Sequence, residues 1–220
     1  MEPNFWTKRW QEGEIGFHRE EAHHYLTQHW HVLKLEPDSE VLVPLCGKST
    51  DMVWLAERGH RIIGVELSPV AVDAFFLEQK LQPTTRVSGP FMIKEAGPYT
   101  IWCGDVFALP PDVTKGIASV YDRAALVAFP PGMQGRYAAK LAELTPTGVP
   151  TMLIGLAYRQ GEISGPPFST PLPQVAMLFG PTHSLSIVES RDGLEQSQNL
   201  KERGVSWLEE SLYILRRKQS

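Results

Sequence analysis

The sequence predicts an α/β fold: a doubly wound, mostly parallel sheet of seven strands with an antiparallel terminal strand. Short apolar, β-branched runs alternate with segments of helical spacing along most of the chain, as in sheets covered by helices. Polar or glycine-containing turns follow four of these runs, and such turns are where open α/β sheets bind ligands. The last two predicted strands are consecutive, which favours an antiparallel pair at one edge.

The first half of the chain holds one helix and then a strand–helix–strand–helix unit. Residues 20–33 repeat apolar side chains at helical spacing and predict the first helix. Ser68 and Pro69 supply an N-cap and a first-turn proline for the last helix of the unit. A right-handed crossover would make the two strands parallel. We expect strands at 41–45 and 61–66, and helices at 49–58 and from Ser68 onward.

The second half continues the alternation after an interruption. Residues 82–98 are rich in proline, glycine and threonine, and we interpret them as an irregular insertion. Further strands are expected at 99–103, 116–121, 151–156, 184–189 and 205–216, with a helix through Tyr137 and a short one at 172–179. The chain, 1–220, is then one domain, with 1–35 as an N-terminal lid or helix and 36–220 as sheet core.

Composition and charge exclude several classes of protein. Hydrophobic residues make up 42% and charged residues 21%, which is ordinary globular composition. A net charge of −4 gives no electrostatic reason to bind nucleic acid or an anionic membrane. The sequence has no apolar run long enough for a membrane span, no recognisable leader and only two cysteines. We therefore expect a cytoplasmic monomer that acts on a small molecule.

The turn after the first strand is the first candidate site. Gly47 allows a backbone to approach a ligand closely, because it has no Cβ. A phosphate loop is excluded, because the turn lacks the glycines of G-x-G-x-x-G and has Leu42 where a Walker A loop needs glycine. A tight strand-to-helix turn without a ligand is the alternative interpretation.

Glu66 makes a nucleoside site the favoured interpretation. It ends the second strand, 19 residues after Gly47, where a carboxylate can accept both ribose hydroxyls of an adenosine. The alternative is a surface glutamate beyond a strand end. Without a phosphate loop, the expected cofactor is an adenosyl compound without phosphates, namely S-adenosylmethionine.

The ends of the third and fourth strands add further candidates. Asp105 would accept a hydrogen bond from the adenine amino group, or it would only form a turn. Val106 would pack against the adenine. Arg123 would face the cofactor carboxylate or an anionic substrate. Asp122 would hold Arg123, or accept a proton from the substrate as a weak catalytic candidate.

The N-terminus is aromatic, and its histidines do not have zinc spacing. Trp6 and Trp10 share one helical face and predict either a docked helix or a lid whose rings attract a sulfonium cation. The histidines between His18 and His31 lack the i,i+4 pair of zinc helices, so we expect no metal. Cys46 has no sequence-adjacent partners of a catalytic nucleophile, and we interpret it as a turn cysteine.

A series of motifs across almost the whole chain resembles the thiopurine S-methyltransferase family in its bacterial form. The motifs are Phe5-Trp6 with Trp10, Gly16-Phe17-His18, Pro44-Leu45-Cys46-Gly47-Lys48-Ser49, Gly59-His60, Gly64-Val65-Glu66, Asp122-Arg123-Ala124-Ala125-Leu126-Val127-Ala128 and Gly165-Pro166-Pro167-Phe168. The resemblance implies a class I methyltransferase fold, S-adenosylmethionine as methyl donor, and methylation of thiol or thione sulfur on aromatic heterocycles.

The resemblance also implies roles for individual residues. Trp10, Leu45, Glu66 and Arg123 match cofactor contacts, with Leu45 contributing a backbone group. Gly47, Asp105 and Val106 are further expected cofactor residues, and Phe17 and Arg123 are expected to contact the substrate.

A heteroaromatic thiol is already partly ionised near neutral pH, so positioning is expected to supply most of the catalysis. The alternatives are methylation of other soft nucleophiles (halide, sulfide, selenium or tellurium compounds), a nicotinamide-dependent oxidoreductase, and a binding module without catalysis.

Overall fold

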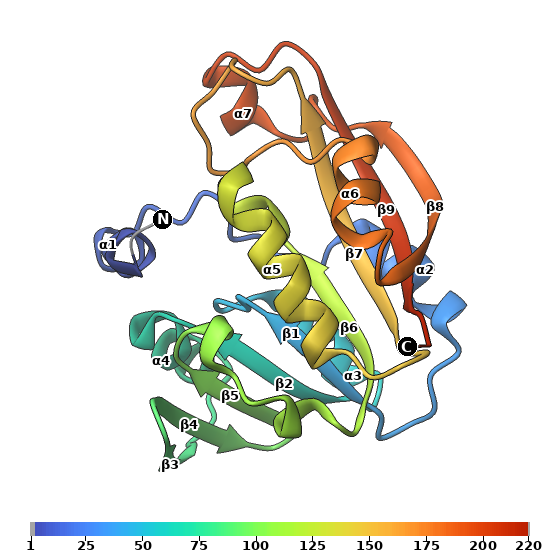
Figure 1. Cartoon of the computed structure of the whole chain (residues 1–220). Helices are drawn as coiled ribbons and strands as arrows, with labels where there is room; N and C mark the ends of the chain where they lie inside the picture. The colour runs from blue at the N-terminus through green and yellow to red at the C-terminus, as the bar shows by residue number, and fades with distance from the viewer. Residues whose placement is uncertain (1–2, 220) are drawn as a thin grey trace. The chain divides into compact units, whose positions relative to one another are not determined.

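The computed structural model describes residues 3–219 (Figure 1). The chain divides into two compact units, Met1–Val120 and Tyr121–Ser220, and each is described on its own. No helix within residues 3–219 combines the length and the apolar character that crossing a membrane requires.

The first unit is built on a sheet in the order β3-β4-β5-β2-β1-β6. Its four strands β5, β2, β1 and β6 are parallel, as the strand–helix–strand pattern predicts. The elements are α1 (Pro3–Glu12), α2 (His24–His29), β1 (Glu40–Pro44), α3 (Thr50–Glu57), β2 (Arg61–Glu66), α4 (Pro69–Glu78), β3 (Thr84–Ser88), β4 (Phe91–Ala96), β5 (Tyr99–Cys103) and the start of β6 (Ile117–Arg123).

Helices α3 and α4 begin where the sequence predicts. The Ser49 side chain accepts a hydrogen bond from the Asp51 N–H at the start of α3, and the Ser68 side chain accepts one from the Ala71 N–H at the start of α4. The helix predicted over 20–33 begins later, at His24, as α2 and passes into a 3-10 turn, η1 (Trp30–Leu33). The apolar periodicity is nevertheless correct, since Leu26, Trp30 and Leu33 are all buried.

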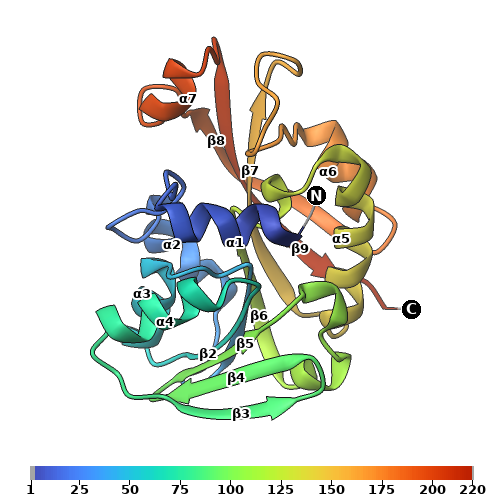
Figure 2. The ribbon, with the colours of Figure 1, turned by 90° about the vertical axis from the view of Figure 1, so that its left-hand side faces the viewer.

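The prediction of an irregular segment at 82–98 is wrong in its central part. β3 and β4 form an antiparallel hairpin, which Figure 2 shows at the outer edge of the sheet. Every residue of β3 is exposed, so this edge strand lacks the apolar alternation by which strands are recognised. The hairpin raises the number of strands in residues 3–219 from the predicted seven to nine.

The second unit carries the predicted antiparallel strands. β9 lies between β7 and β8 and is antiparallel to both. After the end of β6, the elements of the second unit are the 3-10 turn η4 (Leu126–Ala128), α5 (Pro131–Leu144), β7 (Pro150–Tyr158), α6 (Leu172–Phe179), β8 (His183–Asp192), α7 (Gln198–Glu202) and β9 (Leu208–Arg217).

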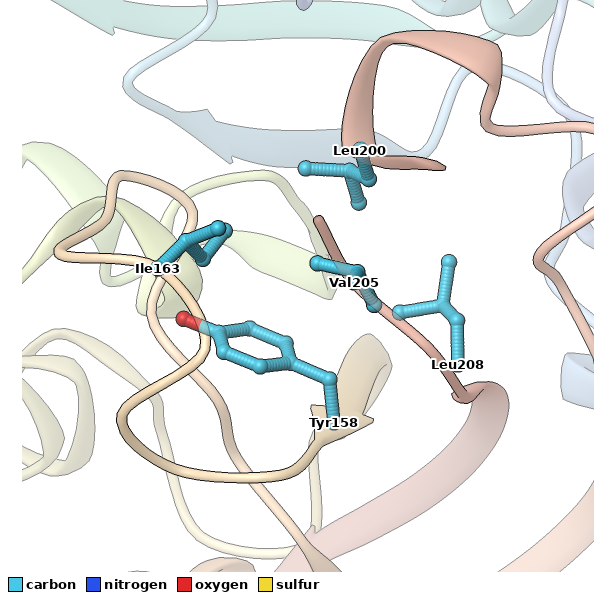
Figure 3. Packing of buried hydrophobic residues seen from close by; sticks show 5 residues of the cluster. All are labelled: Tyr158, Ile163, Leu200, Val205 and Leu208. Atoms are coloured by element: carbon cyan, nitrogen blue, oxygen red, sulfur yellow. The ribbon is translucent and has the colours of Figure 1, made fainter. Parts of the chain in front are cut away.

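A small separate core supports the loop after β7. Figure 3 shows the Tyr158 ring facing side chains from the loop, from α7 and from the start of β9. Arg203 extends this support, because its Nη1 donates to the Pro166 carbonyl at 2.9 Å. The loop is therefore a packed element rather than a free connection. The residues of this core are Tyr158, Ile163, Leu200, Val205 and Leu208.

Candidate functional site

The strand order of the first unit reverses at β1, and this indicates a ligand position at the carboxyl ends of the strands. From β1 the chain adds β2 and then β5 on one side, whereas β6 pairs with the other side of β1. Open α/β sheets bind ligands beyond the carboxyl ends of the strands at such a reversal of order. The turn after β1 therefore occupies the position where a ligand is expected.

This turn has an unusual backbone. Leu45 and Gly47 both have left-handed backbones, with φ of +49° and +52°. A non-glycine residue with positive φ is uncommon, so the conformation of Leu45 is imposed by its surroundings. The Cys46 N–H donates to the Val65 carbonyl at 3.0 Å and fastens the turn to the end of β2.

Glu66 organises the turn from the end of β2. Its Oε2 accepts a hydrogen bond from the Gly47 N–H at 2.9 Å, and its Oε1 accepts one from the Ser68 N–H at 2.7 Å. The side chain is buried, and burial raises the pKa of its carboxyl although these main-chain bonds oppose the rise. A carboxylate has about four acceptor positions, so both oxygens can accept further donors such as hydroxyls.

An aromatic side chain packs directly on Gly47. A Cβ at this position would lie 2.9 Å from Cζ2 of Trp10, so only glycine lets the indole approach the turn. Trp10 is buried, and its ring meets that of Phe17 edge to face at 5.5 Å. Trp6 also meets Phe17 at 5.5 Å, and its buried Nε1 has no hydrogen-bond partner in the described part of the chain.

The turn after β5 lies next to the same strand end. The Gly104 N–H donates to the Glu66 carbonyl at 2.8 Å. Asp105 is exposed, and its Oδ1 accepts a hydrogen bond from the Phe107 N–H at 3.0 Å, which caps the 3-10 turn η2 (Val106–Ala108). Val106 is buried. Asp105 thus has the capping role of a turn aspartate, and Val106 offers an apolar surface.

The second unit begins with the other predicted site residues. Asp122 is buried, with Oδ2 accepting a hydrogen bond from the Tyr137 hydroxyl at 2.6 Å and Oδ1 accepting one from the Leu126 N–H at 3.1 Å. Burial raises the pKa of Asp122 to about 6, although these hydrogen bonds lower it. Arg123 is the last residue of β6 and is half-buried.

The structure brings together two predicted site residues of the first unit, and in the second unit it identifies Tyr137 as a partner of Asp122. Gly47 and Glu66, paired by their spacing in the sequence, are joined by a hydrogen bond. The sequence predicts Tyr137 only as part of a helix, with no role at the site. The signal that could have identified it is its hydroxyl, because a buried tyrosine usually requires a polar partner.

The first unit suits an adenosyl cofactor by the chemistry of its side chains. It combines a buried carboxylate with acceptor capacity, an unpartnered indole donor and aromatic rings around one glycine turn. Such a set can accept hydrogen bonds from ribose hydroxyls and attract a sulfonium cation.

Comparison with known proteins gives matches over the whole chain. The family model described as thiopurine S-methyltransferase matches residues 1–218. A thiopurine S-methyltransferase of Methylococcus capsulatus is 44% identical over 100% of both chains. One of Pseudomonas fluorescens strain SBW25 is 45% identical over 98% of this chain and 99% of its own.

Solved structures show the same fold at low sequence identity. A Burkholderia thailandensis 1,6-didemethyltoxoflavin-N1-methyltransferase, solved with S-adenosylhomocysteine, has a TM-score of 0.66 at 16% identity, covering 99% of this chain and 87% of its own. An S-adenosylmethionine-dependent methyltransferase of Anabaena variabilis has a TM-score of 0.63 at 13% identity, covering 98% of this chain and 95% of its own.

Proposed function

The chain belongs to the thiopurine S-methyltransferase family and is an S-adenosylmethionine-dependent methyltransferase with the class I fold, and from this premise we propose that it methylates the sulfur of aromatic and heterocyclic thiols such as thiopurines. The observation that carries this proposal is the match over residues 1–218 to that family, together with curated relatives of the same printed name. The acceptor is a small molecule with an ionisable sulfur.

The cofactor site that we propose is centred on the turn after β1. Glu66 would accept the ribose hydroxyls through the acceptor positions that Gly47 and Ser68 leave, and the Leu45 backbone would contribute a polar group. Trp10 would cover this turn, because its indole lies against Gly47. When bound, S-adenosylmethionine supplies a methyl group activated by its sulfonium charge.

We expect further cofactor or acceptor contacts from residues at or after other strand ends. Val106 would pack against the adenine, and the exposed Asp105 would accept a hydrogen bond from its amino group while capping η2. Arg123 would pair with the cofactor carboxylate or with an anionic acceptor, because a guanidinium binds carboxylates and thiolates by charge-assisted hydrogen bonds. Phe17 would contact the flat ring of the acceptor.

No general base is required in this proposal. Asp122 is fully buried and bonded to the turn and to α5, so an acceptor has no access to its carboxylate for a proton transfer. An acceptor that enters as a thiolate needs only to be held in line with the methyl group. Positioning of this kind supplies up to about 7–11 kcal/mol of barrier reduction.

We also propose that α1 acts as a lid. Its Trp6 and Trp10 share the ring of Phe17, and the helix packs against α4. Aromatic rings that close over a bound sulfonium would both attract its charge and exclude water.

The acceptor class is tested by a methyl-transfer assay with four probes: a thiopurine, thiophenol, iodide and selenite. We expect the two aromatic sulfur compounds to have the highest kcat/KM, by about tenfold or more, because they combine an ionised sulfur with a ring. The Glu66→Gln variant is the control, since loss of cofactor binding would lower all four rates together. A preference for iodide or selenite would replace this proposal with methylation of other soft nucleophiles.

The cysteines favour a reducing compartment. Cys46 and Cys103 are both free and buried, and burial raises the pKa of both thiols, so neither is activated as a thiolate. We propose the cytoplasm as the location, since free thiols are typical of proteins kept there.

A further inference from the structure

We propose that Asp122 and Tyr137 are positioning residues that fix the direction in which Arg123 leaves the end of β6. The observation behind this inference is a buried carboxylate that joins three segments: the strand end, the turn that follows it, and α5. The inference rests on the role proposed above for Arg123 in binding the cofactor or the acceptor.

The carboxylate of Asp122 holds the turn from inside. Oδ1 accepts a hydrogen bond from the Leu126 N–H at 3.1 Å, and the Ala125 N–H also bonds to this carboxylate. η4 has no side chain on its own N-cap residue that accepts from its first N–H groups. Asp122 therefore supplies this cap from three and four residues earlier in the chain.

The turn needs such support because its backbone is unfavourable. Ala124, the residue after Arg123, has φ of +65°, a left-handed conformation that residues with a Cβ rarely adopt. A conformation of this kind persists only where surrounding contacts determine it. The bonds of Asp122 span Ala124, so they hold the strained residue together with Arg123 on its other side.

Tyr137 holds the carboxylate of Asp122 in place. Its hydroxyl donates to Oδ2 at 2.6 Å, a short charge-assisted bond. Burial raises the pKa of Tyr137 well above its ordinary value, so the hydroxyl remains a donor. The ring is fully buried on α5 and packs against Phe129 with ring centres 4.9 Å apart. The position of the turn is therefore tied to a helix of 14 residues.

Packing of the core alone would not favour this choice of residues, because the pair brings two polar groups into it. A buried carboxylate loses hydration, and apolar side chains of similar shape often stabilise a core equally well. What a hydrogen-bonded pair adds is a unique geometry. A fixed turn sets the Cα–Cβ direction of Arg123 and so the direction in which its side chain starts. This matters for an arginine because its planar guanidinium binds in only a few orientations.

The test is a double-mutant cycle between Tyr137→Phe and Arg123→Met. Two quantities are measured: the dissociation constant of S-adenosylhomocysteine by calorimetry, and kcat/KM for thiophenol. We expect Tyr137→Phe to impair, by about tenfold, whichever quantity Arg123→Met impairs, since a misplacement of about 1 Å can cost about 100-fold and a smaller one costs less. In the Arg123→Met background, the same change should have less than about a twofold effect, because its target is gone.

Tyr213→Phe is the matched control. Tyr213 is buried as deeply in the same unit, and its hydroxyl is hydrogen-bonded to Ser211 on β9. It should leave both quantities within about twofold of the unmodified chain, at a similar loss of thermal stability. If Tyr137→Phe fails to fold, Asp122→Asn takes its place and should show the same coupling.

The outcomes separate this inference from the proposed function. Two results overturn the positioning role alone. In the first, Tyr137→Phe has the same effect with and without Arg123→Met. In the second, Arg123→Met impairs binding or turnover, but Tyr137→Phe alone does not. Unchanged binding and turnover in Arg123→Met itself would overturn the role proposed for Arg123, and the inference with it. Coupling limited to the quantity that Arg123→Met changes supports both.

Discussion

Gly47→Ala tests whether the turn after β1 and α1 form one cofactor site. Gly47 has φ of +52°, and a Cβ there would lie 2.9 Å from Cζ2 and 3.4 Å from Cη2 of Trp10. The alanine would therefore meet two separate penalties, one from the backbone and one from the indole. Gly89→Ala is a matched control, because Gly89 has φ of +54° and its Cβ would meet no atom within 4 Å.

The structure allows the two penalties to be separated. A left-handed alanine costs about 1–2 kcal/mol, and this cost applies to both variants. Overpacking against the Trp10 ring adds about 1–3 kcal/mol for Gly47→Ala alone. The effect of alanine on the unfolded chain is common to both variants and cancels in the comparison. We therefore expect Gly47→Ala to lose about 1–3 kcal/mol more unfolding free energy than Gly89→Ala.

The assay combines urea denaturation with calorimetric titration of S-adenosylhomocysteine. Gly47→Ala should weaken binding by about tenfold or more, equivalent to at least about 1.4 kcal/mol, because displacement of Trp10 and of the Gly47 N–H disturbs both a wall of the site and Glu66. Gly89→Ala should bind normally. The extra loss of stability should disappear when Trp10 is also replaced by alanine. Equal stability losses in the two glycine variants, with binding unchanged, would refute this account of the site.

Three further predictions concern Glu66, Asp122 and α1. Glu66→Ala should weaken S-adenosylhomocysteine binding by about 1–3 kcal/mol in calorimetry, because hydroxyl donors lose a charged acceptor; unchanged affinity would remove Glu66 from the site. Asp122, with its pKa raised from 3.8 to about 6, gives the folded chain more bound protons than the unfolded chain between those values, so its contribution to stability is present at low pH and is lost as pH rises through about 6. In urea titrations, the stability of the unmodified chain relative to Asp122→Asn should fall by about 2 kcal/mol from about pH 4 to about pH 7; a constant difference would contradict this. Deletion of residues 1–12 should leave a folded sheet that binds cofactor more weakly, and cofactor with acceptor should protect residues 5–18 from proteolysis; loss of folding would show that α1 is a core helix.

The comparison of Asp122→Asn with the unmodified chain also removes an opposing contribution. Burial lowers the pKa of His183 to about 4, so this histidine adds stability as pH rises through the same range. Because His183 is present in both proteins, its effect cancels in their difference, and the remaining pH dependence belongs to Asp122.

The sequence predicts the buried strands well, because short apolar, β-branched runs between turns are typical of buried strands. The parallel strands and the antiparallel end appear at the expected positions, within a few residues. The sequence does not predict the hairpin of β3 and β4, because β3 is exposed along its whole length and is held by main-chain pairing, which leaves no pattern in its side chains.

The geometry of the candidate site is predictable from the sequence where a local rule applies, and not where packing between distant segments decides it. The glycine turn and Glu66 follow from the rule that ligands bind at strand ends, and the Gly47–Glu66 hydrogen bond joins these residues. The approach of Trp10 to Gly47 and the bond of Tyr137 to Asp122 join segments that no sequence rule places together. The left-handed backbone of Leu45 is likewise imposed by its surroundings.

Glu66 and Asp122 are both buried carboxylates that hold backbone turns, a use that fits the base-free methyl transfer proposed above. Each lies at or next to the end of a strand, each has a pKa raised by burial, and each accepts hydrogen bonds from the main chain of the turn that follows or faces it. Unpaired charges would be costly in such places, so their bonds to the turns are what make burial tolerable. Methyl transfer to a thiolate depends on holding the reacting groups in line rather than on moving a proton. In the function proposed above, carboxylates that fix backbone turns would serve that requirement without acting as catalytic bases.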